Sequence, residues 1–317
     1  MSLARTLSAN PFILAEAAVI ETLKRTPGIE LDSELANSRL IYDETGRRLI
    51  AGLLHQFIAL ARTIEVPIMV TTPTWRANPD RLERARENRD INTDAVSFVR
   101  HLQAAWGAWG NANILVGGLM SCRHDCYRPE MGLTAAAAED FHVWQARKLS
   151  AAGVDFLIAQ TLPALPEALG LARALAATLS DYIISFVINR RGTLLDGTSL
   201  EKAIATLDAG VARPPLGYMI NCAWLEFIDL AQPEIVTSRL VGFQANASSL
   251  DQAELDGARK LESDDLSAWG RAMVRLNRRL GVKILGGCCG TNVEHLAYLV
   301  ARLAPRRGRS ASYRKDI

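Results

Sequence analysis

The chain has 317 residues, 49% of them hydrophobic and 22% charged, which is the composition of an ordinary soluble globular enzyme. A formal net charge of +2, and no apolar run near the roughly 18 residues of a membrane helix, argue against nucleic acid or a membrane as partner. The first residues do not form a secretory signal, and five irregularly spaced cysteines do not form a disulfide framework, so we expect a cytoplasmic protein.

Short apolar runs alternate with longer helical patterns along the chain. Such runs are typical of parallel strands that are covered on both faces. In chain order they span residues 12–14, 67–71, 113–117, 155–159, 182–187, 217–221, 240–244 and 282–286. Helical patterns at 165–179, 200–207 and 264–280 lie between them, and the last ends at Gly281, a typical helix cap.

Eight repeats of strand and helix predict an α/β fold, a (β/α)8 TIM barrel in one domain over residues 9–304. A doubly wound open sheet is the alternative, which the count of eight disfavours. Residues 305–317 form a basic tail that we expect to be disordered and solvated.

Two segments that follow predicted strands are candidates for active-site loops, because barrel sites form at the C-terminal ends of the strands. Residues 76–94 are polar and rich in arginine, and residues 118–134 are the least regular part of the chain. The second segment contains Cys122, His124 and Cys126, whose spacing does not match the common zinc sites. We therefore expect a substrate-facing loop without metal there, from which Asp125 and Tyr127 could touch substrate.

The strongest local signal is the run from Gly286 to Thr291, with the sequence GGCCGT, at the end of the last predicted strand. The glycines allow a sharp turn that can aim the sulfurs of Cys288 and Cys289 at one point. Cys222 ends another predicted strand, so three thiolates could form a zinc site with one open position. The alternative is that these are buried structural cysteines.

A zinc site of this kind would deprotonate a substrate thiol, and the thiolate is the nucleophilic form of sulfur. Such a thiolate could attack a methyl group on a sulfonium, an ammonium or a folate nitrogen. The sequence therefore predicts methyl transfer to a thiol.

The chain resembles the homocysteine S-methyltransferase family in several segments. GGCCGT at 286–291 and the Asn221-Cys222 pair are similar to the family's zinc motifs, and residues 72–78 resemble its threonine and aromatic loop. The resemblance implies a Zn²⁺ cofactor held by the three cysteines, a small-molecule thiol as acceptor, by default homocysteine giving methionine, and a possible homo-oligomer. The chain is too short for added folate and cobalamin modules, which favours a small onium donor of the S-methylmethionine or betaine type.

Two positions depart from the family pattern. The acidic residue that usually ends the first strand aligns with Ala15, unless a shift of one residue lets Glu16 replace it, and the usual Glu-Thr after the fourth strand is Gln160-Thr161. In the family these two carboxylates help to bind the amino group of homocysteine. The changes raise two alternatives: the same chemistry on a different thiol acceptor, or a non-catalytic zinc-binding barrel.

The remaining polar candidates come from predicted strand ends and the loops after them. Trp75 could instead be an aromatic residue of the core, and the threonines could be strand-end residues that bind no ligand. Asn246 could be an asparagine that only forms a turn. We expect His142 to pack or cap a helix rather than act as a base. The predicted substrate-binding residues are Glu16, Thr72, Thr74, Trp75, Gln160, Thr161, Asn221 and Asn246.

Overall fold

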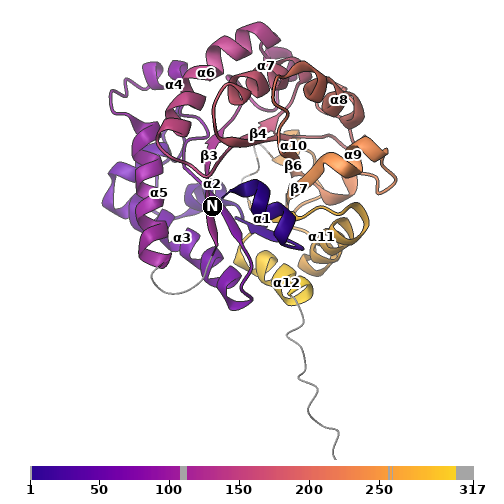
Figure 1. Ribbon diagram of the computed structural model, residues 1–317. Coiled ribbons are helices and arrows are strands. Elements are labelled where there is room, and N and C mark those ends of the chain that lie inside the picture. The colour runs from indigo at the N-terminus through magenta and orange to yellow at the C-terminus, as the bar shows by residue number, and fades with distance from the viewer. Residues whose placement is uncertain (1, 108–112, 256–257, 259, 305–317) are drawn as a thin grey trace, which may run out of the picture.

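Eight parallel strands form a closed barrel, paired in sequence order with β8 against β1. The computed structural model describes residues 2–107, 113–255, 258 and 260–304 (Figure 1). The strands are β1 (Ile13–Ala15), β2 (Ile68–Thr71), β3 (Ile114–Met120), β4 (Phe156–Leu162), β5 (Asp181–Phe186), β6 (Gly217–Ala223), β7 (Leu240–Ala245) and β8 (Ile284–Gly287). The predicted TIM barrel is confirmed, and the open sheet is excluded.

Most helices surround this barrel on its outer side, and a few short ones lie at its two ends (Figure 1). They are α1 (Leu3–Ala9), α2 (Val19–Arg25), α3 (Glu44–Thr63), α4 (Pro79–Arg84), α5 (Ile91–Gly107), α6 (Ala135–Ala151), α7 (Leu165–Ala176), α8 (Leu200–Gly210), α9 (Glu234–Arg239), α10 (Gln252–Leu255), α11 (Leu266–Leu280) and α12 (Val293–Leu303). Three short 3₁₀ helices, η1 (Ser38–Tyr42), η2 (Pro129–Met131) and η3 (Leu225–Phe227), lie in the connections. No described helix is both long enough and apolar enough to cross a membrane.

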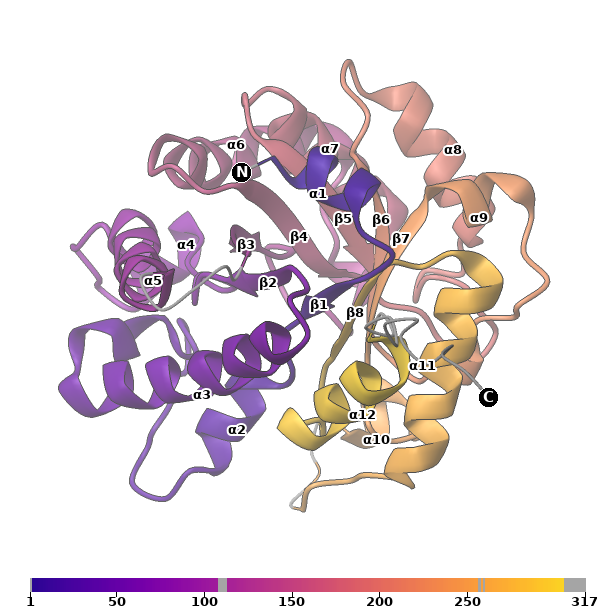
Figure 2. The ribbon, with the colours of Figure 1, turned by 60° about the horizontal axis from the view of Figure 1, so that its bottom comes forward.

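The side chains of the strands alternate between two buried apolar clusters. The inner cluster fills the barrel and includes Ile13, Phe156 and Met219, whereas the outer cluster lies between strands and helices. Helix α1 covers the N-terminal end of the barrel, where Leu3 joins the inner cluster. Figure 2 shows α1 at one end of the barrel and α2 and α10 at the other, and the candidate site lies at this second end.

Strand β3 continues beyond the end predicted from the sequence. The prediction ended this strand at Gly117 and treated residues 118–134 as irregular, but β3 runs through both glycines to Met120. A Cβ at Gly117 would lie 2.3 Å from the Phe156 ring, so glycine is needed there to let that ring fill the barrel. These glycines mark a close contact and not a turn.

Helix ends follow the expected capping rules. The side chain of Asp265 accepts a hydrogen bond from the Ala268 backbone at the start of α11. Gly281 ends this helix with a φ of 67°, which confirms the predicted cap. The polar segment 76–94 contains α4, which Asn78 caps, and the start of α5. The tail at 305–317 lies outside the described residues.

Candidate metal centre

Three cysteine side chains meet at the C-terminal end of the barrel. Cys222 belongs to β6, and Cys288 and Cys289 follow β8 directly. The Sγ atoms of Cys222 and Cys288 are 2.7 Å apart, and the three sulfurs lie within 4.8 Å of one another. All three thiols are free. The sequence singled out these residues from separate segments, and the fold brings them together.

The backbone around the cysteines is held by neighbouring strands. The Cys288 amide donates to the Ala245 carbonyl at 2.7 Å, and the Thr291 hydroxyl donates to the Cys288 carbonyl at 2.6 Å. Gly290 has a φ of 81° and leaves no room for a Cβ beside the Glu262 carbonyl. Cys222 itself has a left-handed φ of 52°, which a side chain rarely adopts. The strand end is therefore bent to present its sulfur.

The three thiols do not hold their protons equally. The pKa of Cys222 is well below its usual value because the thiols of Cys288 and Cys289 donate hydrogen bonds to its sulfur. The pKa values of Cys288 and Cys289 are raised for the same reason. The close approach of the sulfurs thus favours ionisation of one thiol of the cluster and opposes ionisation of the others.

This donor set fits zinc. Thiolates about 2.3 Å from a tetrahedral zinc ion lie about 4 Å from one another. The three sulfurs cluster within 4.8 Å, and those of Cys222 and Cys288, 2.7 Å apart, would separate by about 1 Å to hold the ion. Magnesium and calcium take oxygen ligands, so three sulfurs disfavour them. Among the described residues, no other group of His, Cys, Asp or Glu side chains is close enough to hold a metal.

A cavity of about 360 Å³ opens beside the sulfurs. Its wall combines residues from the C-terminal ends of several strands with residues of the loops that follow them. A more open groove of about 490 Å³ near η3 and α11 contains none of the cysteines. The first cavity is therefore the candidate site. Of the predicted substrate-binding residues, Glu16, Thr72, Trp75, Gln160, Thr161, Asn221 and Asn246 line it.

Glu16 supplies the carboxyl group at the end of β1. Ala15 points into the barrel interior, whereas Glu16 lines the cavity, so the possibility of a one-residue shift is the one that the structure supports. The carboxylate accepts hydrogen bonds from the Thr71 backbone at 3.1 Å and from the Thr71 hydroxyl at 2.5 Å. Burial nevertheless raises the pKa of Glu16 to about 7, because desolvation outweighs these two bonds.

Gln160 pairs with a second amide that the sequence analysis did not identify. Its Nε2 donates to Gln244 Oε1 at 2.6 Å, and Gln244 Nε2 donates to the Glu16 carbonyl at 3.3 Å. The pair links the ends of β4, β7 and β1 without adding charge. One signal in the sequence could have identified Gln244 as a site residue: this glutamine interrupts the apolar run of the seventh strand near its end.

Thr161 and Asn221 hold the Cys222 end of the site. Asn221 Nδ2 donates to the Thr161 hydroxyl at 2.7 Å, and the Thr161 amide donates to Asn221 Oδ1 at 2.9 Å. Thr161 also has a left-handed φ of 61°. The nearby Asn246 side chain is buried, and its Oδ1 has no hydrogen-bond partner among the described residues. This oxygen is itself buried, so a turn of the side chain toward the cavity would bring it into contact with a ligand.

The loop after β2 divides its predicted residues between two roles. Thr72 and Trp75 line the cavity, but Thr74 does not. The Thr74 hydroxyl donates to the Leu119 carbonyl at 2.7 Å and lies 2.7 Å from the Thr72 hydroxyl. Thr74 is therefore a buried residue that links this loop to β3, and it does not line the cavity.

The loop after β3 is anchored by a buried glutamate. Glu167 accepts hydrogen bonds from the Arg123 backbone at 2.7 Å, the Leu133 backbone at 3.2 Å and His142 Nε2 at 3.0 Å. Burial opposes ionisation of Glu167, but these bonds outweigh it and lower the pKa of the carboxyl. His142 is fully buried, does not line the cavity and bonds the glutamate. The loop places Asp125 and Tyr127 on the cavity wall.

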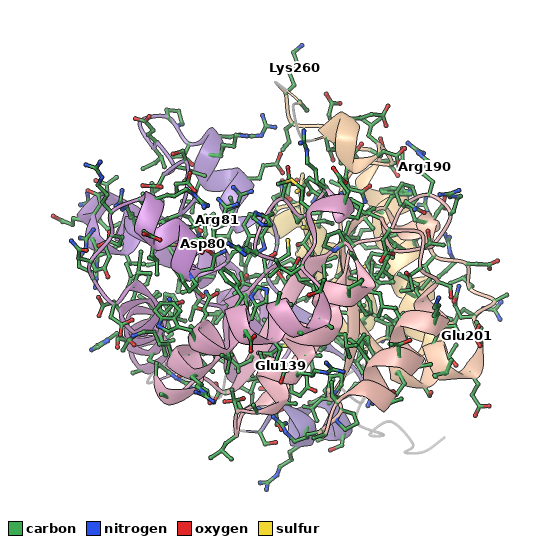
Figure 3. All side chains as sticks on the ribbon, turned by 90° about the horizontal axis from the view of Figure 1, so that it is seen from above. Asp80, Arg81, Glu139, Arg190, Glu201 and Lys260 are labelled. Carbon is green, nitrogen blue, oxygen red and sulfur yellow. The ribbon has the colours of Figure 1, made fainter. Side chains whose placement is uncertain are left out.

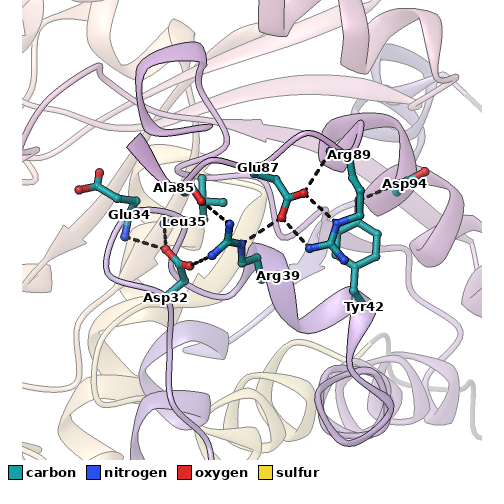
Figure 4. A network of polar contacts seen from close by, with 9 residues as sticks. All are labelled: Asp32, Glu34, Leu35, Arg39, Tyr42, Ala85, Glu87, Arg89 and Asp94. Carbon is teal, nitrogen blue, oxygen red and sulfur yellow. Dashed lines mark hydrogen bonds and ion pairs between the residues drawn. The ribbon is translucent and has the colours of Figure 1, made fainter. Parts of the chain in front are cut away.

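An ion-pair network fixes the wall formed by the connection between α2 and α3 (Figure 4). Arg39 pairs with Asp32 at 2.6 Å and with Glu87 at 3.0 Å, and Arg89 pairs with Glu87 at 2.6 Å. Hydrogen bonds from Arg89 lower the pKa of Glu87 to about 2. The network joins this connection, which contributes Asn37 to the cavity, to the segment between α4 and α5.

The family model for homocysteine S-methyltransferase matches residues 13–303. The chain belongs to the homocysteine S-methyltransferase family. The homocysteine S-methyltransferase YbgG of Bacillus subtilis (strain 168) is 29% identical over 181 residues, 55% of this chain and 55% of that protein. The S-methylmethionine–homocysteine S-methyltransferase BHMT2 of Pongo abelii is 25% identical over 258 residues, 76% of this chain and 66% of that protein. The matches therefore span about half to two thirds of these curated relatives.

Solved structures agree on the fold. The metallated form of the homocysteine methyltransferase MmuM from Escherichia coli superposes with a TM-score of 0.71 at 22% identity, covering 94% of this chain and 98% of that one. The oxidised form of the same protein gives a TM-score of 0.71 at 23% identity, over 93% and 97% of the two chains. The single-domain barrel of this homocysteine S-methyltransferase family member is the fold of those structures.

Proposed function

We propose that this chain is a zinc-dependent S-methyltransferase, which moves a methyl group from a small onium donor to homocysteine and so forms methionine. The observation that carries the proposal is the convergence of three free cysteine sulfurs on one wall of a cavity in a chain of this family. Because the comparisons are with homocysteine methyltransferases, a different thiol acceptor and a non-catalytic barrel are not favoured. The resemblance implies a possible homo-oligomer, and the cysteine content favours the cytoplasm.

Cys222, Cys288 and Cys289 would hold the zinc ion. When bound, zinc supplies a Lewis acid that favours the thiolate form of an incoming thiol. Three protein ligands leave one coordination position for that thiol. The residues of the chain then have to hold the remainder of both substrates in line, so that the sulfur of the acceptor faces the methyl group of the donor.

Acceptor atoms on the wall suit an ammonium group. The carboxyl of Glu16 has a pKa of about 7 and can ionise when a cation binds beside it. The unpartnered Asn246 Oδ1 offers a neutral acceptor in the same cavity. Gln160 Nε2 is used by Gln244, which leaves the Gln160 oxygen to accept. These groups would bind the amino group of homocysteine with less charge than two carboxylates provide.

Trp75 offers a site for the onium donor. Its ring lines the cavity, and an aromatic face attracts a sulfonium or quaternary ammonium cation. An S-methylmethionine or betaine type of donor would therefore be held by the ring, with its methyl group directed toward the sulfur of the acceptor.

The first test is the metal content of the purified protein. Wild type prepared under reducing conditions should hold about one zinc ion per chain and form methionine from homocysteine and S-methylmethionine or betaine. Cys288→Ala should lose both. Cys122→Ala, which removes a buried cysteine outside the triad, is the matched control and should keep the metal. A zinc-free wild type, or zinc retained by Cys288→Ala, contradicts the proposal.

A further inference from the structure

Four basic side chains belong to the wall of the cavity. Two of them are exposed at its rim, and a third is already in an ion pair. Lys24 and Lys260 are exposed at the rim, and Figure 3 shows Lys260 extending away from the body of the molecule. Arg25 is already paired with the Glu21 carboxylate at 3.1 Å. The fourth, Arg76, is half-buried.

Arg76 has no anionic partner within the described part of the chain. Neither a hydrogen bond nor an ion pair occupies its guanidinium there, and its recorded contact is with the Trp75 ring, 4.8 Å from the ring centroid. Two other arginines of the same region, Arg81 and Arg84, both contact the Glu34 carboxylate. An arginine that faces a cavity with its N–H groups free is arranged to bind an anion.

The backbone holds Arg76 in this position. The Ala77 amide donates to the Thr74 carbonyl at 2.9 Å, which closes a turn with Trp75 and Arg76 at its centre. Gln145 Nε2 also donates to the Thr74 carbonyl, at 3.0 Å, and Asn92 Nδ2 donates to the Ala77 carbonyl at 2.9 Å. Stacking on Trp75 fixes the plane of the guanidinium. The free donors are thus pre-organised and lose little freedom when a ligand binds.

We infer that Arg76 is the carboxylate-binding residue of this cavity and selects amino-acid substrates over their decarboxylated analogues. The inference rests on the proposed function and adds a specificity residue to it. A planar guanidinium matches a carboxylate through two parallel N–H···O bonds. Both the acceptor homocysteine and a donor such as S-methylmethionine carry that group, so the carboxylate could come from either substrate.

This assignment also explains how the cavity can bind an amino-acid head although Gln160 is uncharged. An ammonium bound at Glu16 and Asn246 and a carboxylate bound at Arg76 would share the recognition of one zwitterion. In this arrangement the protein lacks a negative charge at Gln160, beside the ammonium of the ligand. The positive charge of Arg76, beside the carboxylate of the ligand, makes up for it.

The test compares two pairs of probes by titration calorimetry on the zinc-loaded protein under reducing conditions. The acceptor pair is L-homocysteine and 3-aminopropane-1-thiol, and the donor pair is S-methylmethionine and (3-aminopropyl)dimethylsulfonium. Within each pair the second compound lacks only the carboxylate. Wild type should bind the carboxylated member of one pair roughly 10- to 100-fold more tightly, the effect of one charge-assisted contact. The pair that shows the preference identifies the source of the carboxylate.

Arg76→Gln should reduce this preference to within about threefold, and Arg76→Lys should keep part of it, because a lysine retains the charge and loses the planar fork. Arg84→Gln removes a paired arginine outside the cavity and should leave the preference unchanged. Zinc content and the urea midpoint of each variant confirm that it is folded.

Equal binding within both pairs by wild type, or a preference that survives in Arg76→Gln, overturns the role of Arg76 and leaves the proposed function intact. If none of the four compounds binds to zinc-loaded wild type, the proposed function and this inference fail together.

Discussion

The buried carboxyl of Glu16 should make the stability of the protein depend on pH in a predictable direction. Its pKa rises from the ordinary 4.5 to about 7 on folding, chiefly because of burial. One pKa unit corresponds to about 1.4 kcal/mol, so the rise corresponds to about 3 kcal/mol. Between pH 4.5 and pH 7 the unfolded chain loses this proton and the folded chain keeps it. The free energy of unfolding therefore falls as pH rises through this window and levels off above it.

The Glu16→Gln substitution removes this titration and keeps the size of the side chain. Its amide oxygen can still accept from the Thr71 backbone, and the Thr71 hydroxyl can reorient to accept from the amide nitrogen. Relative to wild type, Glu16→Gln should gain about 2.5 kcal/mol in free energy of unfolding between pH 5 and pH 8. At pH 5 the two proteins should differ far less than at pH 8.

Urea unfolding of both proteins at pH 5, 6, 7 and 8, at one fixed zinc concentration, measures this gain. Contributions that are common to both proteins, including the pH dependence of metal binding, cancel in the difference. Glu201→Gln, which removes an exposed carboxylate at the start of α8, is the control and should give a flat difference. A difference for Glu16→Gln that stays within about 0.5 kcal/mol over the whole range would refute the reasoning.

Two further substitutions test the cavity wall and its support. Gln160→Glu restores a carboxylate beside the cavity, and rotation of the Gln244 amide allows Gln244 to donate to it. We expect this variant to bind homocysteine roughly tenfold more tightly than wild type at pH 8, as measured by calorimetry. The same measurement with S-methylmethionine and its decarboxylated analogue provides the comparison. An unchanged affinity for homocysteine would count against an ammonium group at this position. Glu167→Ala leaves two half-buried backbone donors and a buried imidazole without their acceptor, so urea unfolding should show a loss of about 3 kcal/mol. A loss below about 1 kcal/mol would show that the loop after β3 has another anchor.

The barrel could be predicted from the sequence because each strand is a short apolar run between polar helices. The eight runs match the eight strands to within a few residues, and the Gly281 cap fixes the end of α11. Two strand ends, at Gly117 and Ala159, were predicted three residues too early. The first error arose because the glycine at position 117 could serve either a turn or close packing. Its role here depends on the Phe156 ring, which lies 39 residues away in the chain and is a neighbour only in the barrel.

The three cysteines could also be predicted, because barrel geometry brings strand ends together wherever they lie in the sequence. Which polar side chains reach the cavity could not be read in the same way. Glu16 and Ala15 differ by one position, and the direction of a side chain at a strand end depends on local backbone bending. The pairing of Gln160 with Gln244 and the contacts of Glu167 join distant segments whose separate sequences carry no signal of each other.

Two residues of the site, Thr161 and Cys222, occupy left-handed backbone that costs of order 1–3 kcal/mol each for a residue with a side chain. Glycine would relieve that cost at either position and would delete the hydroxyl or the sulfur. If variants of this protein were selected only for thermal stability, without selection for activity, we expect such replacements to be among the first to appear. Selection for heat tolerance alone would therefore favour the loss of both side chains, and with Cys222 the loss of one of the three sulfurs of the proposed zinc site.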